Sequence, residues 1–306
     1  MKTLLSLSLA ALMSLSATAG FAAKGTIGIS VLTLQNPFFK VIADNVASEA
    51  KKSDYDVVVV SSEFDPGTQN NQVNDFIVQK VSAIILTPAD SKAIVPAIQK
   101  ANEAGIPVFT ADIAVMGEGA KVVSHIATDN YAGGKQAAQA MNEALGGKGK
   151  VAIIDHPEVE SVILRTKGFQ DELKALNSGI EIVGSWPGRG SKDVSFSVAQ
   201  EILQANPELN GFFCINDPSA LGAVAALEIA KKSDVMVVGF DGQPEGKKAI
   251  REGKIYADPI QYPDKIGQIT VQTIMSYLNG EDVQPQVLIP TGLYKKADAE
   301  NDPEAK

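Results

Sequence analysis

Short apolar runs alternate with longer helical patterns along most of the chain, and this alternation limits the possible folds more than any other feature. The runs span residues 26–32, 57–60, 83–86, 108–111, 122–126, 151–154, 180–183, 212–215 and 235–240. Runs that are apolar almost throughout are typical of strands buried on both faces of a parallel sheet. A βαβ repeat of this kind predicts parallel sheets covered by helices on both sides.

The segments between the runs have the spacing and the end signals of helices. One helical pattern begins after Asn36 and Pro37, and another covers residues 93–104 and ends at Gly105. Further patterns cover residues 130–145, 217–231 and 265–278. Proline at the start of a helix and glycine just past its end are the expected boundary residues.

The repeat contains more strands than one small sheet holds, so we predict two Rossmann-like α/β lobes. A length of 306 residues agrees with two domains. The predicted lobes comprise residues 23–127 plus 262–290 and residues 128–261 plus 291–302. Three crossings near residues 127–128, 261–262 and 290–291 would form the hinge. Residues 303–306 are charged and are predicted to be a flexible tail.

The first residues have the pattern of a secretory signal peptide. Lys2 precedes an apolar, serine-spaced run, and small residues follow it up to Ala22. The run is short and rich in serine compared with a membrane span of about 20 apolar residues. We therefore predict that residues 1–22 are cleaved and that the mature protein is exported.

Composition excludes several classes of protein. The chain has 27 Lys plus Arg against 36 Asp plus Glu, a net charge of −9, whereas a nucleic-acid binder needs a basic surface. Cys214 is the only cysteine, so disulfides cannot form the framework, and we expect it to be a small core residue. His125 and His156 are the only histidines, and we expect no metal site and no cofactor.

Polar and aromatic residues follow several of the apolar runs, at the place where open α/β sheets bind ligands. These residues are Asn36, Phe38, Phe39, Asp112, His156, Asn216 and Asp241. Carboxylates accept hydroxyl protons, amides donate and accept, and rings pack against C–H faces. The first run is not followed by the glycine-rich fingerprint of a dinucleotide site. The pattern therefore favours a polyhydroxyl ligand.

Four segments carry a resemblance to a known family. They are residues 34–39 (LQNPFF), 122–130 with 133–135, 216–217 with 220–223, and 232–242. In this order and spacing, the chain resembles the periplasmic sugar-binding proteins of ABC importers, in the ribose-binding branch of the type I periplasmic binding fold. The resemblance covers nearly all of the mature chain. It implies a periplasmic, non-enzymatic protein that closes two lobes around a sugar.

The resemblance also implies site residues and partners. The implied ligand shell comprises Asn36, Phe38, Phe39 and Asp112 from the first lobe and Arg165, Asn216, Asp241 and Gln261 from the second. The implied partners are a monosaccharide or sugar alcohol and the permease of an ABC importer. A chemotaxis receptor is a compatible further partner, and we expect a monomer that binds no nucleic acid.

Three departures from the family pattern indicate a ligand other than ribose. The ribose binders have an arginine where this chain has Ile113, an aromatic residue near Gly190, and an apolar residue in place of His156. A larger pentose, a hexose, a ketose such as psicose or tagatose, or a sugar alcohol would fit the altered site. Trp186 or His156 would then replace the lost contacts.

Two other functions fit parts of the sequence. Asp112 and Asp241 would be the paired carboxylates of a secreted sugar hydrolase. The fold is also that of the effector domain of a sugar-responsive repressor. For single residues, the structural alternatives are a surface ion pair of Arg165 with Glu160 or Asp171, and a loop-capping role for His156.

Overall fold

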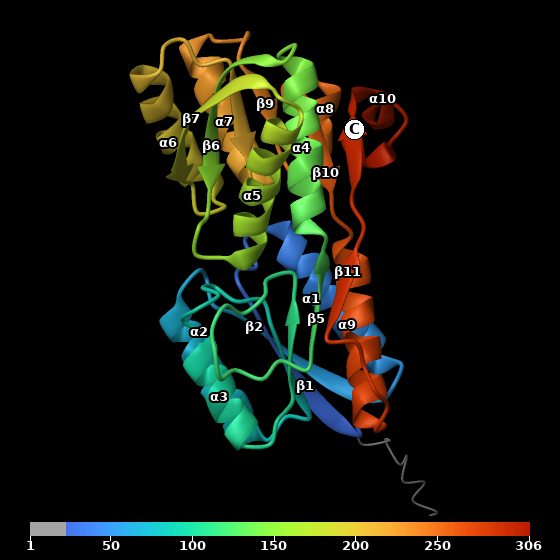
Figure 1. The fold of residues 1–306 in the computed structure, drawn as a ribbon. Coiled ribbons are helices and arrows are strands. Elements are labelled where there is room, and N and C mark those ends of the chain that lie inside the picture. The colour runs from blue at the N-terminus through green and yellow to red at the C-terminus, as the bar shows by residue number, and fades with distance from the viewer. Residues whose placement is uncertain (1–22) are drawn as a thin grey trace, which may run out of the picture.

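The computed structural model describes residues 23–306, which form two α/β lobes drawn one above the other in Figure 1. The predicted signal peptide, residues 1–22, lies outside the described residues. Each lobe contains a six-stranded sheet with helices on both faces. The predicted fold class, two lobes with parallel sheets, is confirmed.

The first lobe, the lower one in Figure 1, combines the start of the chain with one segment from its last third. Its strands are β1 (Gly25–Val31), β2 (Tyr55–Ser61), β3 (Ala83–Leu86), β4 (Val108–Ala111), β5 (Ser124–Thr128) and β11 (Gln286–Ile289). Its helices are α1 (Pro37–Lys51), α2 (Pro66–Gln79), α3 (Val95–Glu103) and α9 (Pro263–Leu278). The strand order is β11-β5-β4-β3-β1-β2, and all pairs are parallel. Helices α1 and α9 cover one face, and α2 and α3 cover the other.

The second lobe has the same plan with one reversed strand. Its strands are β6 (Lys148–Asp155), β7 (Gly179–Pro187), β8 (Gly211–Cys214), β9 (Met236–Val238), β10 (Ala257–Ile260) and β12 (Gly292–Lys295). Its helices are α4 (Asn130–Ala144), α5 (Glu160–Ala175), α6 (Lys192–Ala205), α7 (Asp217–Ala230), α8 (Pro244–Arg251), α10 (Lys296–Ala299) and the 3-10 turn η1 (Pro303–Ala305). The strand order is β12-β10-β9-β8-β6-β7, with β12 antiparallel to β10.

The chain passes between the two sheets three times, after β5, after β10 and between β11 and β12. Strand β5 continues through Thr128, which pairs with Ile289 of β11, so the first sheet extends one residue beyond residue 127. Because the strands of both sheets are parallel apart from β12, the carboxyl ends of each sheet lie on one edge.

The end of the chain is packed, which corrects the prediction of a flexible tail at residues 303–306. Ala305 is 1% exposed and belongs to the apolar core of the second lobe. Lys247 of α8 pairs with Asp302 at 3.0 Å and with Glu304 at 2.6 Å. The charged composition of this segment suggested solvation, but its charges are matched by a lysine on a neighbouring helix.

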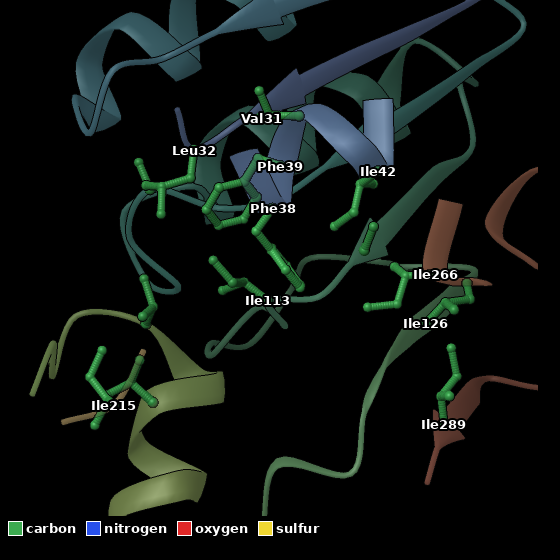
Figure 2. Packing of buried hydrophobic residues seen from close by; sticks show 14 of the residues in the cluster. Val31, Leu32, Phe38, Phe39, Ile42, Ile113, Ile126, Ile215, Ile266 and Ile289 are labelled. Atoms are coloured by element: carbon green, nitrogen blue, oxygen red, sulfur yellow. The ribbon is translucent and has the colours of Figure 1, made fainter. Parts of the chain in front are cut away.

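The largest apolar cluster reaches the gap between the lobes. Figure 2 shows Phe38 and Phe39 at the start of α1 close to Leu32 and Ile113, with Ile215 contributed by the second lobe. Cys214 lies in the core as predicted, and burial raises the pKa of its thiol. Within residues 23–306, we find no helix that is long and apolar enough to cross a membrane.

Candidate ligand-binding site

The carboxyl-end edges of the two sheets enclose a cavity of about 40 Å³. Every residue of the predicted ligand shell lines this cavity, and so do Ile113, His156 and Gly190. These residues come from loops and helix starts that are far apart in sequence. The topology therefore brings the strand-end residues of both lobes to one place.

The start of α1 supplies the apolar wall from the first lobe. Asn36 caps the helix by accepting a hydrogen bond from the backbone N–H of Phe38 at 2.9 Å, and Pro37 occupies the first helical turn. The rings of Phe38 and Phe39 meet edge to face, with centroids 5.3 Å apart. The cap fixes the turn after β1, so both rings face the cavity and the amide nitrogen of Asn36 is left for a ligand.

Asp112 places a carboxyl group in the cavity from the end of β4. Its backbone has a φ of +64°, in the left-handed region that non-glycine residues rarely adopt. Its Oδ1 atom is buried without a hydrogen-bond partner. Burial raises the pKa of Asp112 to about 7, although the charge of Arg165 opposes the shift. Such a group is stabilised by any ligand that donates a hydroxyl proton to it.

Arg165 lies 3% exposed in α5, and the second lobe holds its guanidinium group from several sides. Nε donates to Oδ1 of Asn130 at 2.7 Å, and Nη1 donates to the carbonyl oxygen of Ile215 at 2.7 Å. Nη1 is also 3.3 Å from Oδ1 of Asp241, and the guanidinium carbon lies 3.9 Å from the ring centroid of Phe240. Arg165 is therefore rigid, and its closest carboxylate is Asp241.

The sequence left open a surface ion pair of Arg165 with Glu160 or Asp171. The pairing with Asp171 is wrong. That carboxylate is instead paired with Lys167 one helical turn away. Glu160 lies at the start of α5, where burial raises its pKa and the charge of Arg165 opposes the shift only in part.

Asp241 follows β9 and accepts three side-chain hydrogen bonds. Besides Arg165, Nε2 of Gln261 donates to Oδ1 at 2.6 Å and Nε2 of Gln243 donates to Oδ2 at 3.1 Å. Burial raises the pKa of Asp241, and Arg165 and the two amides oppose this shift. The backbone φ of Asp241 is +107°, so Asp241, like Asp112, has a positive φ. Oε1 of Gln261 is buried without a partner.

Asn216, Gly190 and His156 form the opposite side of the cavity. Asn216 caps α7 through Ser219, and its Nδ2 donates to the carbonyl oxygen of Gly190 at 3.2 Å. Gly190 has a φ of +63°, and a Cβ added to it would lie 3.0 Å from that nitrogen. His156 is buried 3.6 Å from a carboxylate oxygen of Glu158, and burial lowers the pKa of its ring. His156 therefore presents a neutral imidazole near pH 7.

Phe64 is a cavity residue that sequence analysis missed. It follows β2, and its ring centroid lies 6.4 Å from that of His156 across the gap. The strand-end rule that found Asp112 also applies to the second apolar run, so the signal was present in the sequence. Ser161, Val159 and Val162 at the start of α5 also line the cavity and have no comparable sequence signal.

The prediction that Trp186 contributes to the ligand site needs correction. Trp186 lies near the end of β7, next to Ile154 of β6, and packs against the apolar core of the second lobe. Its ring covers Gly184, where an added Cβ would lie 2.5 Å from it. Trp186 is not among the residues that line the cavity, because its indole packs against the core beside helices α6 and α7.

The cavity therefore combines aromatic walls, fixed hydrogen-bond donors and acceptors that lack a hydrogen-bond partner. The unpartnered acceptors are Oδ1 of Asp112 and Oε1 of Gln261, and they come from different lobes. We find no group of His, Cys, Asp and Glu arranged to hold a metal ion among residues 23–306. The chemistry of the site fits a small molecule with several hydroxyl groups and an apolar face.

Comparisons with known proteins agree with this fold. The model of the periplasmic binding protein domain matches residues 27–282. The ribose import binding protein of Escherichia coli is 39% identical over 298 residues, which cover 97% of this chain and 99% of that protein.

Two solved structures of ABC transporter solute-binding proteins are also similar. One, from Actinobacillus succinogenes with bound D-allose, has a TM-score of 0.83 at 31% identity and covers 91% of this chain and 100% of that one. Another, from Agrobacterium vitis with bound α-D-tagatopyranose, has a TM-score of 0.86 at 26% identity and covers 92% and 98%.

Proposed function

Because this chain belongs to the periplasmic binding protein family, we propose that it captures a monosaccharide or sugar alcohol between its lobes and delivers it to the permease of an ABC importer. The family consists of transport binding proteins and not of enzymes. A raised pKa like that of Asp112 also occurs in general acids, but the hydrolase alternative has no support from the relatives.

The observation that carries the proposal is the pair of unpartnered buried oxygens in one cavity. Oδ1 of Asp112 and Oε1 of Gln261 lie on opposite lobes, and each accepts no hydrogen bond from the described chain. A buried acceptor without a donor costs about 1–3 kcal/mol. A ligand that donates hydroxyl protons to both lobes removes this cost only when the lobes are closed, so it stabilises the closed form.

The proposed contacts follow from the chemistry of each side chain. Asp112 and Asp241 accept hydroxyl protons, and Arg165 donates to ring or hydroxyl oxygens. The rings of Phe38 and Phe39 pack against the C–H faces of the sugar. Asn36, Asn216 and Gln261 complete the shell, and His156 and Ile113 adjust its shape.

We further propose that ribose is not the preferred ligand. Ile113 and Gly190 are smaller or less polar than the residues of the ribose binders, and His156 adds an imidazole. Solved structures similar to this one hold D-allose and α-D-tagatopyranose, which contain one more carbon than ribose.

Two measurements test the proposed function. Native mass spectrometry of protein purified from cells identifies a copurified pentose, hexose or alditol by its mass. Isothermal titration against a panel of these sugars then ranks their affinities. A protein that binds no sugar in the panel would falsify the function, and one that binds ribose most tightly would contradict the proposed preference.

The location and the remaining partners are also proposals. Residues 1–22 have the composition of a cleaved signal peptide, and the matched relatives are import binding proteins, so we propose a periplasmic monomer. A chemotaxis receptor is a second proposed partner of the closed form. N-terminal sequencing of protein from a periplasmic extract would detect cleavage near Ala22, and an intact N-terminus would contradict it.

Ser91 provides a test of the proposed closure of the two lobes around the sugar, because it forms hydrogen bonds between the lobes. Its backbone N–H donates to the carbonyl oxygen of Glu158 at 3.0 Å, and its Oγ accepts from the backbone N–H of Glu160 at 2.9 Å. We expect Ser91→Ala to lower the apparent sugar affinity about 2- to 10-fold, because the closed form loses one hydrogen bond. Titration calorimetry measures this change. Ser233→Ala, which changes an exposed serine, is the control. An unchanged affinity in Ser91→Ala would contradict the role of this inter-lobe hydrogen bond in closure.

A further inference from the structure

Two buried carboxyl groups lie next to the proposed sugar site but do not line its cavity. Asp217 is the first residue of α7 and is 1% exposed, and Asp258 in β10 is 0% exposed. The two side chains are close enough to shift each other's pKa, although neither carboxylate can donate a hydrogen bond to the other without a proton. Without a proton between them, Oδ1 of Asp217 and both oxygens of Asp258 would have no donor.

Both carboxyl groups are almost fully buried, and two glycines approach them closely. A Cβ added to Gly246 of α8 would lie 2.1 Å from Oδ1 of Asp217. A Cβ added to Gly239, after β9, would lie 2.5 Å from Oδ1 of Asp258. Two ionised carboxylates in contact at such a place repel each other and lack solvation.

A short chain of hydrogen bonds connects the pair to the sugar site. Oδ2 of Asp217 accepts from the backbone N–H of Gln243 at 2.6 Å. The side chain of Gln243 then donates from Nε2 to Oδ2 of Asp241 at 3.1 Å. Asp217 therefore fixes the backbone of the residue whose side chain holds Asp241.

We propose that Asp217 and Asp258 share one proton in the folded protein, and that this protonated pair positions Asp241 through Gln243. Oδ1 of Asp217 carries the proton and donates it to Asp258, which leaves Oδ2 of Asp217 free to accept from Gln243. Asp217 and Asp258 are thus positioning residues and do not touch the ligand. Only the importance of Asp241 rests on the proposed function, because the shared proton is a property of the protein without sugar.

The groups around the pair favour the protonated form. Burial raises the pKa of Asp217 well above its usual range and the pKa of Asp258 to about 6, and the charge of Asp241 raises both. From β8 the pair faces the neutral thiol of Cys214, whose pKa is raised by burial and by Asp258. From β12 the neighbour of Asp258 is Tyr294, whose hydroxyl donates to Asp302. Helix α8 faces the pair with Gly246, so the described elements bring no cation into contact with it.

The pH dependence of folding tests the shared proton without any sugar. Both aspartates of the unfolded chain are ionised above about pH 5, whereas the folded pair keeps one proton, so folding takes up a proton. Relative to Asp217→Asn, which donates an N–H in place of the proton, the folding equilibrium constant of the wild type should fall about tenfold per pH unit as the pH rises above about 6.5, while the folded pair keeps its proton. Urea unfolding at several pH values measures this difference.

Two further variants keep the result interpretable. Asp258→Asn also replaces the shared proton by an N–H, so it should show the same shallower pH dependence as Asp217→Asn. Asp234→Asn removes a carboxylate from an exposed turn and should follow the wild type. Wild-type and Asp217→Asn curves that stay parallel over this pH range would overturn the shared proton.

The side-chain amide signal of Gln243 in an NMR spectrum tests the positioning role, again without sugar. In the wild type this amide is hydrogen-bonded to Asp241, so its proton signal should lie away from the position of a solvated glutamine amide. Asp217→Ala should move the signal toward that position, and Asp217→Asn should restore it. A signal that is the same in the wild type and Asp217→Ala would overturn the positioning role, and folding of each variant is checked in the same spectra.

Discussion

Replacing Arg165 with methionine will lower the free energy of unfolding by about 3–5 kcal/mol and abolish detectable sugar binding. The guanidinium group pairs with Asp241 and hydrogen-bonds Asn130 and the carbonyl oxygen of Ile215. Removing it leaves a buried carboxylate without its cation, which costs far more than the pair itself contributes. Methionine keeps the length and volume of the aliphatic stem, so a cavity does not cause the loss.

Urea unfolding and titration calorimetry at neutral pH measure both effects. Arg251 at the end of α8 is exposed, and Arg251→Met is the matched control, with an expected change within about 0.5 kcal/mol. Arg165→Lys keeps the charge but loses the planar fork, so it should recover part of the stability and little of the affinity. A loss of stability below about 1 kcal/mol in Arg165→Met would contradict the structural role of this residue.

The sequence was sufficient to predict the fold because its apolar runs are short and buried on both faces. The run at residues 83–86 coincides with β3, and the run at residues 108–111 coincides with β4. Boundaries were less accurate where polar residues extend a strand. Strand β7 continues to Pro187, beyond the apolar residues 180–183, because pairing with β6 and not hydrophobicity defines its end.

The candidate site was predictable to the extent that its residues follow strands. Asp112, Asn216 and Asp241 lie where the topology of a parallel sheet places residues that come after its strands. Gln261 directly follows β10, but the sequence of this strand is not an apolar run, and Arg165 lies within a helix, so both were taken from the family resemblance alone. Trp186 was misplaced because an aromatic residue at the end of a strand can face the helices as well as the cleft.

The carboxyl pair of Asp217 and Asp258 illustrates what sequence patterns do not contain. The two residues are far apart in the chain, and Asp258 is followed by Pro259 within a short strand, which reads as a turn signal. Only the packing of α7 and α8 against β9 and β10 shows that both carboxyl groups are buried together. The antiparallel strand β12 was missed for a similar reason, since its pairing with β10 comes from the third chain crossing.

Replacing Asp112 with asparagine will weaken sugar binding by roughly 10- to 100-fold while the fold is kept. Asparagine tolerates the left-handed backbone at this position, so no strain is added. The change replaces one carboxylate oxygen by an N–H₂ group, which cannot accept a hydroxyl proton from the ligand. Titration calorimetry measures the loss, and Asp282→Asn on the exposed surface of the same lobe is the control. Equal affinities in Asp112→Asn and the wild type would show that this carboxylate does not contact the sugar.

Asp112 also makes closure of the ligand-free lobes depend on pH. In the open form its carboxyl group is in water with a pKa of about 3.9, whereas burial in the closed form raises the pKa to about 7, so closure takes up a proton. The closed form is therefore favoured at low pH, and this preference is lost as the pH rises to about 7. Small-angle scattering measures this dependence. The radius of gyration of the ligand-free wild type should increase from about pH 5 to about pH 8 more than that of Asp112→Asn. Identical pH profiles of the two proteins would contradict this role of Asp112.

A sugar hydroxyl that donates to Asp112 favours its ionised form. The sugar therefore stabilises the closed form most strongly above pH 7, where the empty lobes have the least tendency to close.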